Sequence, residues 1–290
     1  MNYLNLLLFF LFLTSTLTKT RSDPPSSPGG SGGGGKHFVL VHGACLGAWS
    51  WYKLSTLLQS AGHRVTALDM AAAGVDPRKA ENLKSFSEYV QPLMNFMAEL
   101  RAEEKVILVG HSQGGLCISK AMEGFPEKIS VAVFVVAAMP GPSLNVSFLL
   151  GQFRKRIDFG PDSRYTFGNG PKSPPTTLTF GPLFLASKLF NKSPKEDLTL
   201  GKTLMRPTHL FEAQQWNKDL VLTKERYGAV KRVFVVSDKD KVIQMSFQKW
   251  VIQKNPPTAV VEVRGSDHMV MMSKPLDLFN KLSHIAHHYS

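Results

Sequence analysis

Short apolar runs alternate along the chain with stretches in which apolar residues recur at helical spacing. Amphipathic helices are clearest around Trp51, Leu54 and Leu58, and again where Leu278, Leu282 and Ile285 close the chain. The unbroken runs predict six strands, over residues 38–41, 65–68, 106–109, 131–136, 233–236 and 259–263. A repeated strand-then-helix order implies a mostly parallel sheet with helices on both faces, and strands buried on both sides need no polar alternation.

Between about residues 141 and 227 this rhythm breaks. The segment is rich in Pro, Phe and Leu and is too long for a connecting loop. Its many apolar side chains need burial, which argues against a disordered insert. We therefore expect a cap inserted over one edge of the sheet.

The first 35 residues differ in kind from the rest. An apolar run from Leu6 to Leu13 is too short to span a bilayer and is followed by small residues, so residues 1–20 resemble a secretory signal peptide or another targeting segment. Residues 21–35 are a linker rich in Gly, Pro and Ser. We expect a folded domain over 36–290 and a secreted or endomembrane protein, with plastid and cytoplasm as alternatives.

The strongest chemical signal is VILVGHSQGG, from Val106 to Gly115. A strand runs directly into Gly-x-Ser-x-Gly and then into a helical segment, which is the context of the nucleophile elbow of an α/β hydrolase. Gly110 and Gly114 remove side chains that would clash in the tight turn. Ser112 is then presented at a helix N-terminus, where the helix dipole favours developing negative charge. The sequence predicts Ser112 as a nucleophile.

A serine nucleophile needs a base, and in this fold an acid and then a histidine follow the serine along the chain. His268 comes just after the last predicted strand and is the expected base. His209 falls in the predicted cap and could touch substrate. Asp238 and Asp240 both follow the strand at 233–236, and either could orient the imidazole. Spacing alone does not choose between them.

An oxyanion hole needs backbone donors near the reacting carbonyl. The residue after the nucleophile, Gln113, supplies one amide. The loop that follows the strand at 38–41 reads His42-Gly43-Ala44, and Ala44 is expected to supply the other.

Charge and composition add no second function. The chain has 290 residues, 43% of them hydrophobic, and a formal net charge of +12. Because Lys and Arg are scattered and no nucleic-acid motif occurs, we expect a solvated basic surface and no nucleic-acid partner. No HExxH or phosphate-binding glycine loop is present, so neither a metal nor a cofactor is expected. We expect a small-molecule ester as partner and allow for a homodimer.

Several stretches together resemble the plant methylesterase family, which also includes hydroxynitrile lyases and polyneuridine aldehyde esterase. The resemblance runs from about Lys36 to Ser290 and rests on HFVLVHGACLGAWSWYKL, LVGHSQGGL, VAVFVVAAMP, SPKEDLTL, RPTHLF, FQKW and GSDHMVMM. It implies an α/β-hydrolase fold and removal of methanol from methylated plant hormones through an acyl-enzyme.

The resemblance also implies which aspartate is the acid. In the family this residue lies seven positions before the Phe of a Phe-Gln-x-Trp motif, which here begins at Phe247, and so corresponds to Asp240. The implied triad is Ser112, Asp240 and His268.

Two positions separate esterases from lyases within the family. The lyases carry Thr where this chain has Gly43 and Lys where it has Met269. A lysine supplies charge that favours cyanide release, and methionine cannot, so an esterase is expected. The alternatives are a lyase, tested by cyanide release from mandelonitrile, and a non-hydrolytic hormone receptor, tested by a burst of methanol.

A third position bears on the substrate. Relatives that bind salicylate carry an aromatic residue where this chain has Ala138. A smaller side chain widens the pocket, so we expect methyl jasmonate or methyl indole-3-acetate to fit better than methyl salicylate. Gly43, Ala138 and Met269 are the expected substrate-binding positions.

Overall fold

Six parallel strands form the central sheet of the protein, of which a computed structural model describes residues 35–289. The predicted signal peptide, and all of the predicted linker except Gly35, lie outside the described residues. The strands are β1 (His37–Val41), β2 (Arg64–Leu68), β3 (Val106–His111), β4 (Ile129–Val135), β8 (Arg232–Ser237) and β9 (Ala259–Val263). Their order across the sheet is β2-β1-β3-β4-β8-β9. The predicted α/β fold is confirmed, and every predicted strand is present.

The sequence predicted strands buried on both faces of the sheet, and only the central strands are buried in this way. Every residue of β1 and β3 is buried, whereas β9 alternates, with Val260 48% exposed. An edge strand has a neighbour on one side only, and the helices do not cover its whole width. The apolar run at 259–263 therefore predicted the strand correctly but overstated its burial.

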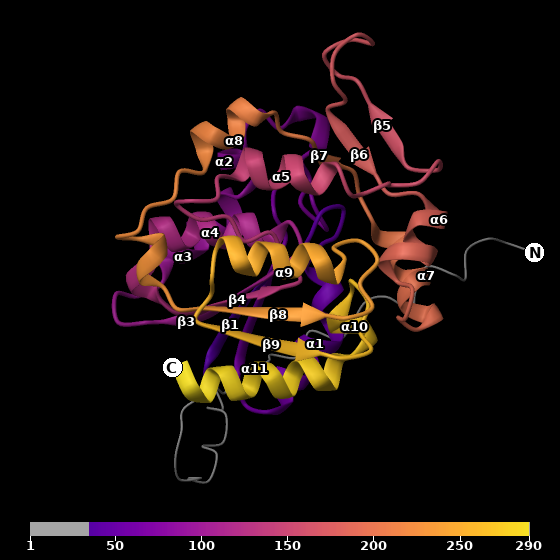
Figure 1. Ribbon diagram of the computed structural model, residues 1–290. Helices are drawn as coiled ribbons and strands as arrows, with labels where there is room; N and C mark the ends of the chain where they lie inside the picture. The colour runs from indigo at the N-terminus through magenta and orange to yellow at the C-terminus, as the bar shows by residue number, and fades with distance from the viewer. Residues whose placement is uncertain (1–34, 290) are drawn as a thin grey trace, which may run out of the picture. The chain divides into compact units, whose positions relative to one another are not determined.

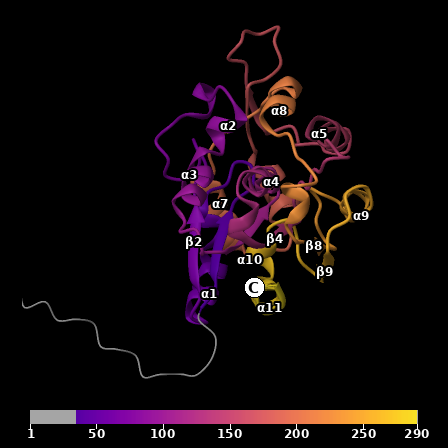
Figure 2. The ribbon, with the colours of Figure 1, turned by 90° about the vertical axis from the view of Figure 1, so that its left-hand side faces the viewer.

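Helices cover both faces of the sheet (Figures 1 and 2). The turn η1 (Ala48–Trp51) leads into α1 (Tyr52–Ser60), which packs with α10 (Val270–Ser273) and α11 (Pro275–Tyr289) on one face. The other face carries α3 (Gln91–Glu99), α4 (Gly114–Gly124) and α9 (Met245–Lys254). Shorter elements are η2 (Ala80–Asn82), α2 (Phe86–Tyr89) and η3 (Pro126–Lys128). No described helix is long and apolar enough to cross a membrane.

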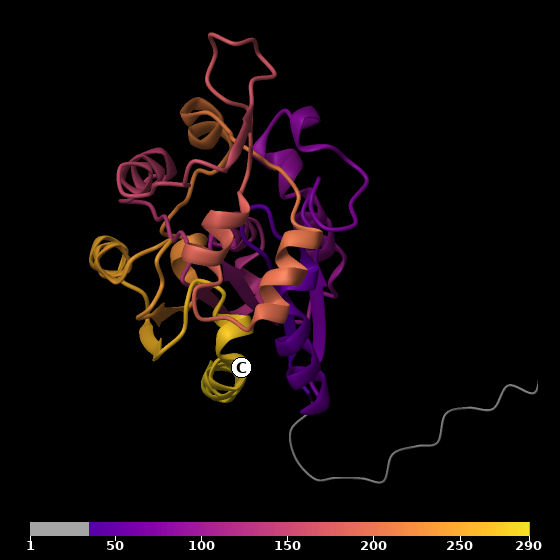
Figure 3. The ribbon, with the colours of Figure 1, turned by 90° about the vertical axis from the view of Figure 1, so that its right-hand side faces the viewer.

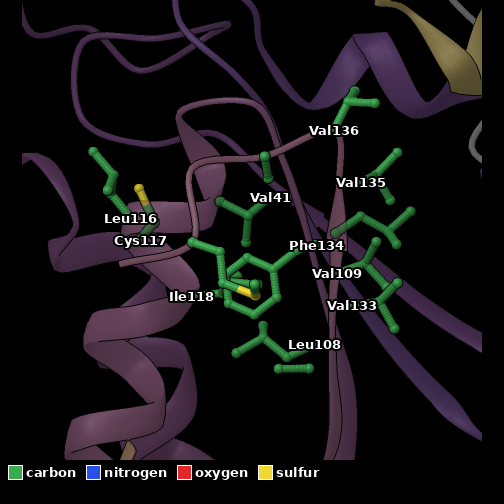
Figure 4. Packing of buried hydrophobic residues seen from close by; sticks show 14 of the residues in the cluster. Val41, Leu108, Val109, Leu116, Cys117, Ile118, Val133, Phe134, Val135 and Val136 are labelled. Carbon is green, nitrogen blue, oxygen red and sulfur yellow. The ribbon is translucent and has the colours of Figure 1, made fainter. Parts of the chain in front are cut away.

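The helix that follows the Ser112 turn is held by the core. Eight residues of α4 are buried, and Figure 4 shows Ile118 on the side of this helix that faces Leu108 and Phe134. Burying side chains of this size stabilises the fold by about 1.5–3 kcal/mol each. The packing fixes the N-terminus of α4 against the ends of β3 and β4.

A cap is inserted between β4 and β8. It comprises α5 (Val146–Arg154), β5 (Arg164–Thr166), β6 (Thr177–Thr179), α6 (Pro182–Phe184), η4 (Leu185–Leu189), α7 (Lys195–Leu204), β7 (Thr208–His209) and α8 (Ala213–Asp219), and η5 (Tyr227–Ala229) leads back to the core. Its three strands pair antiparallel in the order β5-β6-β7. Figure 3 looks toward the ends of the core strands, with α6 and α7 in front of them.

Buried polar contacts join the cap to the core. The carboxylate of Asp197 is fully buried and accepts hydrogen bonds from Lys53 Nζ at 2.6 Å and Tyr52 Oη at 2.7 Å. The guanidinium of Arg206 donates to backbone carbonyls in the loop at 74–78. The cap is therefore anchored to the core by charged side chains whose hydrogen bonds go to protein groups in place of water.

Candidate active site

Ser112 lies in a sharp turn between β3 and α4, in the left-handed backbone region at φ +53°. A Cβ added at Gly114 would lie 2.6 Å from the carbonyl oxygens of Val41 and His42, and one added at Gly110 would lie 2.8 Å from Gly114 O. Those contacts are far too short, so both flanking positions need glycine, as the sequence predicted. The Ser112 amide donates to Val135 O at 3.2 Å, which ties the turn to the end of β4.

The imidazole of His268 is held by Asp240. His268 Nδ1 lies 2.7 Å from Asp240 Oδ2, and both side chains are almost fully buried. The second carboxylate oxygen of Asp240 accepts the backbone amides of Val242 and Ile243 at 2.7 and 2.9 Å. Because a carboxylate accepts, Nδ1 carries the proton and Nε2 keeps its lone pair for a proton from serine.

Asp238, the other candidate acid, points elsewhere. Its carboxylate accepts the Gly265 amide at 2.6 Å and pairs with Lys239 at 3.0 Å. The structure thus brings Asp240, and not Asp238, to His268.

Ser112 and His268 line one cavity between core and cap. Ala44, Gln113 and Ala138 also line it, and the remaining wall is mostly apolar, with aromatic side chains from Phe153, Phe159, Phe180, Phe211, Trp216 and Phe247. Within residues 35–289 the Ser112 hydroxyl has no hydrogen-bond partner. In a free enzyme the hydrogen bond between nucleophile and base is often long, and it shortens when substrate binds.

Ala44 and Gln113, the two expected oxyanion donors, both line this cavity. Gln113 is the N-cap residue of α4, and Ala44 precedes a left-handed residue, Cys45, at φ +61°. Neither amide donates to another group in the described part of the chain. Burial raises the pKa of the Cys45 thiol to about 12, so the neutral thiol donates to Leu178 O at 3.3 Å and links this loop to the cap. Two free amides beside a serine can hold a negatively charged oxygen.

The chain is similar to alpha/beta hydrolases and to named plant proteins. Residues 38–282 match the model of the alpha/beta hydrolase family. The chain is 54% identical over 256 residues to methyl jasmonate esterase 1 of Vitis vinifera, covering 88% of this chain and 98% of that one. It is 48% identical to salicylic acid-binding protein 2 of Nicotiana tabacum, covering 88% and 99%. The chain belongs to the plant methylesterases.

A solved structure extends the similarity to three dimensions. Tomato methylketone synthase I in complex with 2-tridecanone superposes with a TM-score of 0.86 at 51% identity, covering 88% of this chain and 99% of that one. The predicted family membership is confirmed, and this methylesterase is a serine hydrolase of carboxylic esters.

The three expected substrate-binding positions divide into two kinds. Ala138 lines the cavity of the methylesterase, but Gly43 and Met269 are buried outside the described lining. A Cβ at Gly43 would lie 2.8 Å from Ser112 Cβ and 3.0 Å from His111 Nδ1. Gly43 therefore packs behind the serine, and any influence on substrate passes through Ser112. Met269 adjoins His268 in the chain and caps α10.

Two polar residues near the site carry no recognisable sequence signal. His111 Nε2 lies 2.9 Å from the carbonyl oxygen of His268, and burial, followed by the neighbouring His268, lowers the pKa of His111 well below its ordinary value. The contact joins residues 157 positions apart. No pattern local to the Gly110–Gly114 motif could have indicated it.

Asp267 is the second such residue. Its Oδ2 accepts the amides of Lys192 and Ser193 and the Ser193 hydroxyl at 2.7–2.9 Å, and its Oδ1 accepts the Met269 amide at 3.0 Å. This buried carboxylate joins the cap to the segment that carries His268. Residues 35–289 contain no group of three His, Cys, Asp or Glu side chains suited to a metal ion.

Proposed function

We propose that this protein hydrolyses methyl esters of plant hormones, and that methyl jasmonate and methyl indole-3-acetate are better substrates than methyl salicylate. Support for the hormone esters comes from the similarity to methyl jasmonate esterase 1. Support for the order of preference comes from Ala138, which lines the cavity.

The proposed chemistry is an acyl-enzyme reaction. His268 Nε2 takes the proton of Ser112 as its oxygen attacks the ester carbonyl, and Asp240 stabilises the imidazolium that forms. The amides of Ala44 and Gln113 hold the oxyanion. The intermediate collapses, the imidazolium protonates the leaving methoxide, and methanol departs. Water activated by His268 then hydrolyses the acyl-enzyme and regenerates Ser112.

The small side chain of Ala138 favours a large acyl group in the substrate. Its amide donates to Ser112 O at 3.0 Å, which fixes this residue close to the nucleophile. A methyl group at this place leaves space that an aromatic ring would fill, and the surrounding wall is apolar. A bulky acyl group therefore gains more buried contact than the single ring of salicylate.

The experiment is an esterase panel of the three methyl esters. We expect the highest kcat/KM for methyl jasmonate or methyl indole-3-acetate. Ser112→Ala should release no methanol above the rate measured without enzyme. Ala138→Phe should narrow the cavity and shift the ratio of kcat/KM toward methyl salicylate. A kcat/KM for methyl salicylate above those of both other esters in the unmodified protein would refute the proposed preference.

We also propose that residues 1–20 direct the chain into the secretory pathway. The proposal is supported by the apolar run from Leu6 to Leu13 and the small residues that follow it. Fusing residues 1–35 to a fluorescent protein should send the fusion to the endomembrane system or out of the cell. Uptake into plastids, or retention in the cytoplasm, would contradict it.

A further inference from the structure

We propose that His209 is a specificity-determining residue, which accepts a hydrogen bond from an N–H or O–H group in the acyl part of the substrate. The inference rests on the proposed function, because it names the class of ester that the same cavity prefers. Its basis is a fixed imidazole ring in a mostly apolar cavity wall, with one nitrogen that has no hydrogen-bond partner in the described chain.

The tautomer of His209 follows from its contact with η2. Its Nδ1 lies 2.8 Å from the carbonyl oxygen of Ala80. A carbonyl can only accept, so Nδ1 carries the hydrogen, and in the neutral ring Nε2 is an acceptor. The two nitrogens point in widely different directions from the ring, so Nε2 faces away from Ala80.

The ring is also held in place by packing. His209 belongs to β7, where it pairs with Thr177 of β6, and its ring centroid lies 4.5 Å from that of Phe211. Within the described chain Nε2 has no hydrogen-bond partner. A fixed, unpaired acceptor can bind a donor without losing side-chain freedom on binding.

The position of His209 suits recognition of the acyl group. His209 enters the cavity wall from the cap, whereas Ser112 enters it from the core sheet. The other polar residues of the wall are Ser112, Gln113, Arg154, Thr208 and His268. Ser112 and His268 are assigned to the chemistry, Arg154 has only donors, and the side chains of Gln113 and Thr208 can donate as well as accept. With Nδ1 bonded to Ala80 O, His209 by contrast offers an acceptor alone. An ester held at Ser112 would thus present its acyl group toward the cap and His209.

This arrangement favours acyl groups that carry a donor. The indole N–H of methyl indole-3-acetate is such a group, whereas the ketone of methyl jasmonate offers only an acceptor. Both are apolar enough for the cavity, but only the first satisfies Nε2. A net hydrogen bond of this kind corresponds to about a three- to tenfold preference.

The test compares two esters of the same shape, methyl indole-3-acetate and methyl benzofuran-3-acetate, in which oxygen replaces N–H. We expect the unmodified protein to favour the indole ester in kcat/KM by about three- to tenfold. His209→Phe keeps a ring against Phe211 but has no acceptor, so the ratio should fall to about one. His209→Gln can donate to Ala80 O and still accept, so it should retain part of the preference.

A purely structural role for His209 would give a different result. In that case His209→Phe would lower the melting temperature or the turnover of both esters equally and leave their ratio unchanged, and the proposal would be wrong. Equal kcat/KM values for both esters in the unmodified protein would also overturn it. The readout is the ratio of kcat/KM for the two esters, because a change of cavity shape in His209→Phe acts on two substrates of the same shape alike.

Failure of the proposed function can be told apart from failure of this inference. If neither ester is hydrolysed, the proposed function fails, and the two free acids are titrated calorimetrically into the Ser112→Ala protein. Tighter binding of indole-3-acetate than of benzofuran-3-acetate, lost in the Ser112→Ala, His209→Phe double variant, would support the role of His209. Equal binding would overturn it.

Discussion

At the scale of single residues, the site depends on a backbone conformation that serine adopts reluctantly. The left-handed conformation of Ser112 costs of the order of 1–3 kcal/mol, and it persists because neighbours fix the turn. The amide of Ser112 is bonded to Val135 O, and its carbonyl oxygen accepts the amides of Gly115 and Ala138. The strain places the hydroxyl in the cavity.

The two aspartates after β8 provide a residue-scale prediction. Asp240→Asn keeps the size of the side chain but no longer stabilises the imidazolium of His268, so kcat should fall by about 10⁴-fold. Asp238→Asn is the matched control, since its carboxylate serves Gly265 and Lys239 at the protein surface. Steady-state kinetics on one ester should show no more than about a twofold loss for this control. A large loss in Asp238→Asn with little loss in Asp240→Asn would reverse the assignment.

A second residue-scale prediction concerns the space behind the nucleophile. Gly43→Ala adds a Cβ that would press on Ser112 Cβ and His111 Nδ1, and displacing the serine should lower kcat by about ten- to a hundredfold. Gly151→Ala in α5 is the control, because its Cβ would meet nothing within 4 Å. It should leave kcat unchanged and add about 0.5–1 kcal/mol to the free energy of unfolding. Wild-type turnover in Gly43→Ala would mean that the turn can relax.

At the scale of elements, the cap is joined to the core by buried ionic and hydrogen-bonded contacts. Helix α7 is tied to α1 through Asp197, and strand β6 to the loop after β1 through Cys45. The segment at 192–193 is tied to the His268 segment through Asp267. Each contact leaves a group buried without a partner if it is broken, which costs more than the intact contact contributes.

Lys53→Met tests one of these contacts. It keeps the apolar stem of the side chain and removes the ammonium, which leaves the Tyr52 hydroxyl as the one hydrogen-bond donor to the buried Asp197 carboxylate among the described residues. We expect the free energy of unfolding, measured by urea titration, to fall by about 1–3 kcal/mol. Arg101→Met breaks a pair with Glu103 in which both side chains are at least 70% exposed. That control should change stability by less than about 0.5 kcal/mol, and an equal loss in both variants would contradict the argument.

At the scale of the whole molecule, buried histidines couple stability to pH. Burial, followed by the charge of Arg64, lowers the pKa of His37 from 6.5 to about 4. Burial also lowers the pKa values of His42 and His111. Below pH 6.5 the unfolded chain therefore binds protons that the folded protein does not, and the free energy of unfolding falls as the pH falls.

The corresponding measurement is the urea midpoint between pH 7 and pH 5. Each such histidine contributes a slope of up to about 1.4 kcal/mol per pH unit, so stability should decline steadily over this range. His37→Gln should make the decline shallower, whereas His284→Gln, at an exposed position of α11, should leave it unchanged. Stability that rises as the pH falls would contradict the assignment.

Much of this architecture follows from local patterns. Apolar runs located all six core strands, because a parallel sheet covered by helices requires such runs. The lost rhythm after Gly141 located the cap but not its three short strands, since two- and three-residue strands are too short for periodicity. The choice between Asp238 and Asp240 depends on a contact between distant parts of the chain. The amides of Val242 and Ile243 hold the carboxylate of Asp240 against His268, which lies 28 positions later. No propensity of either aspartate encodes that long-range contact.

The buried carboxylate of Asp267 has a consequence for exchanging caps between relatives in order to redesign specificity. Two of its three partners in the cap are backbone amides, which any grafted sequence could supply, but the third is the hydroxyl of Ser193. A transplanted cap must therefore reproduce the backbone path at 192–193 and keep a hydroxyl side chain at 193. A graft that misses this path would leave a negative charge without its cap partners one residue before His268, and would lose activity even if its new pocket fitted the intended ester.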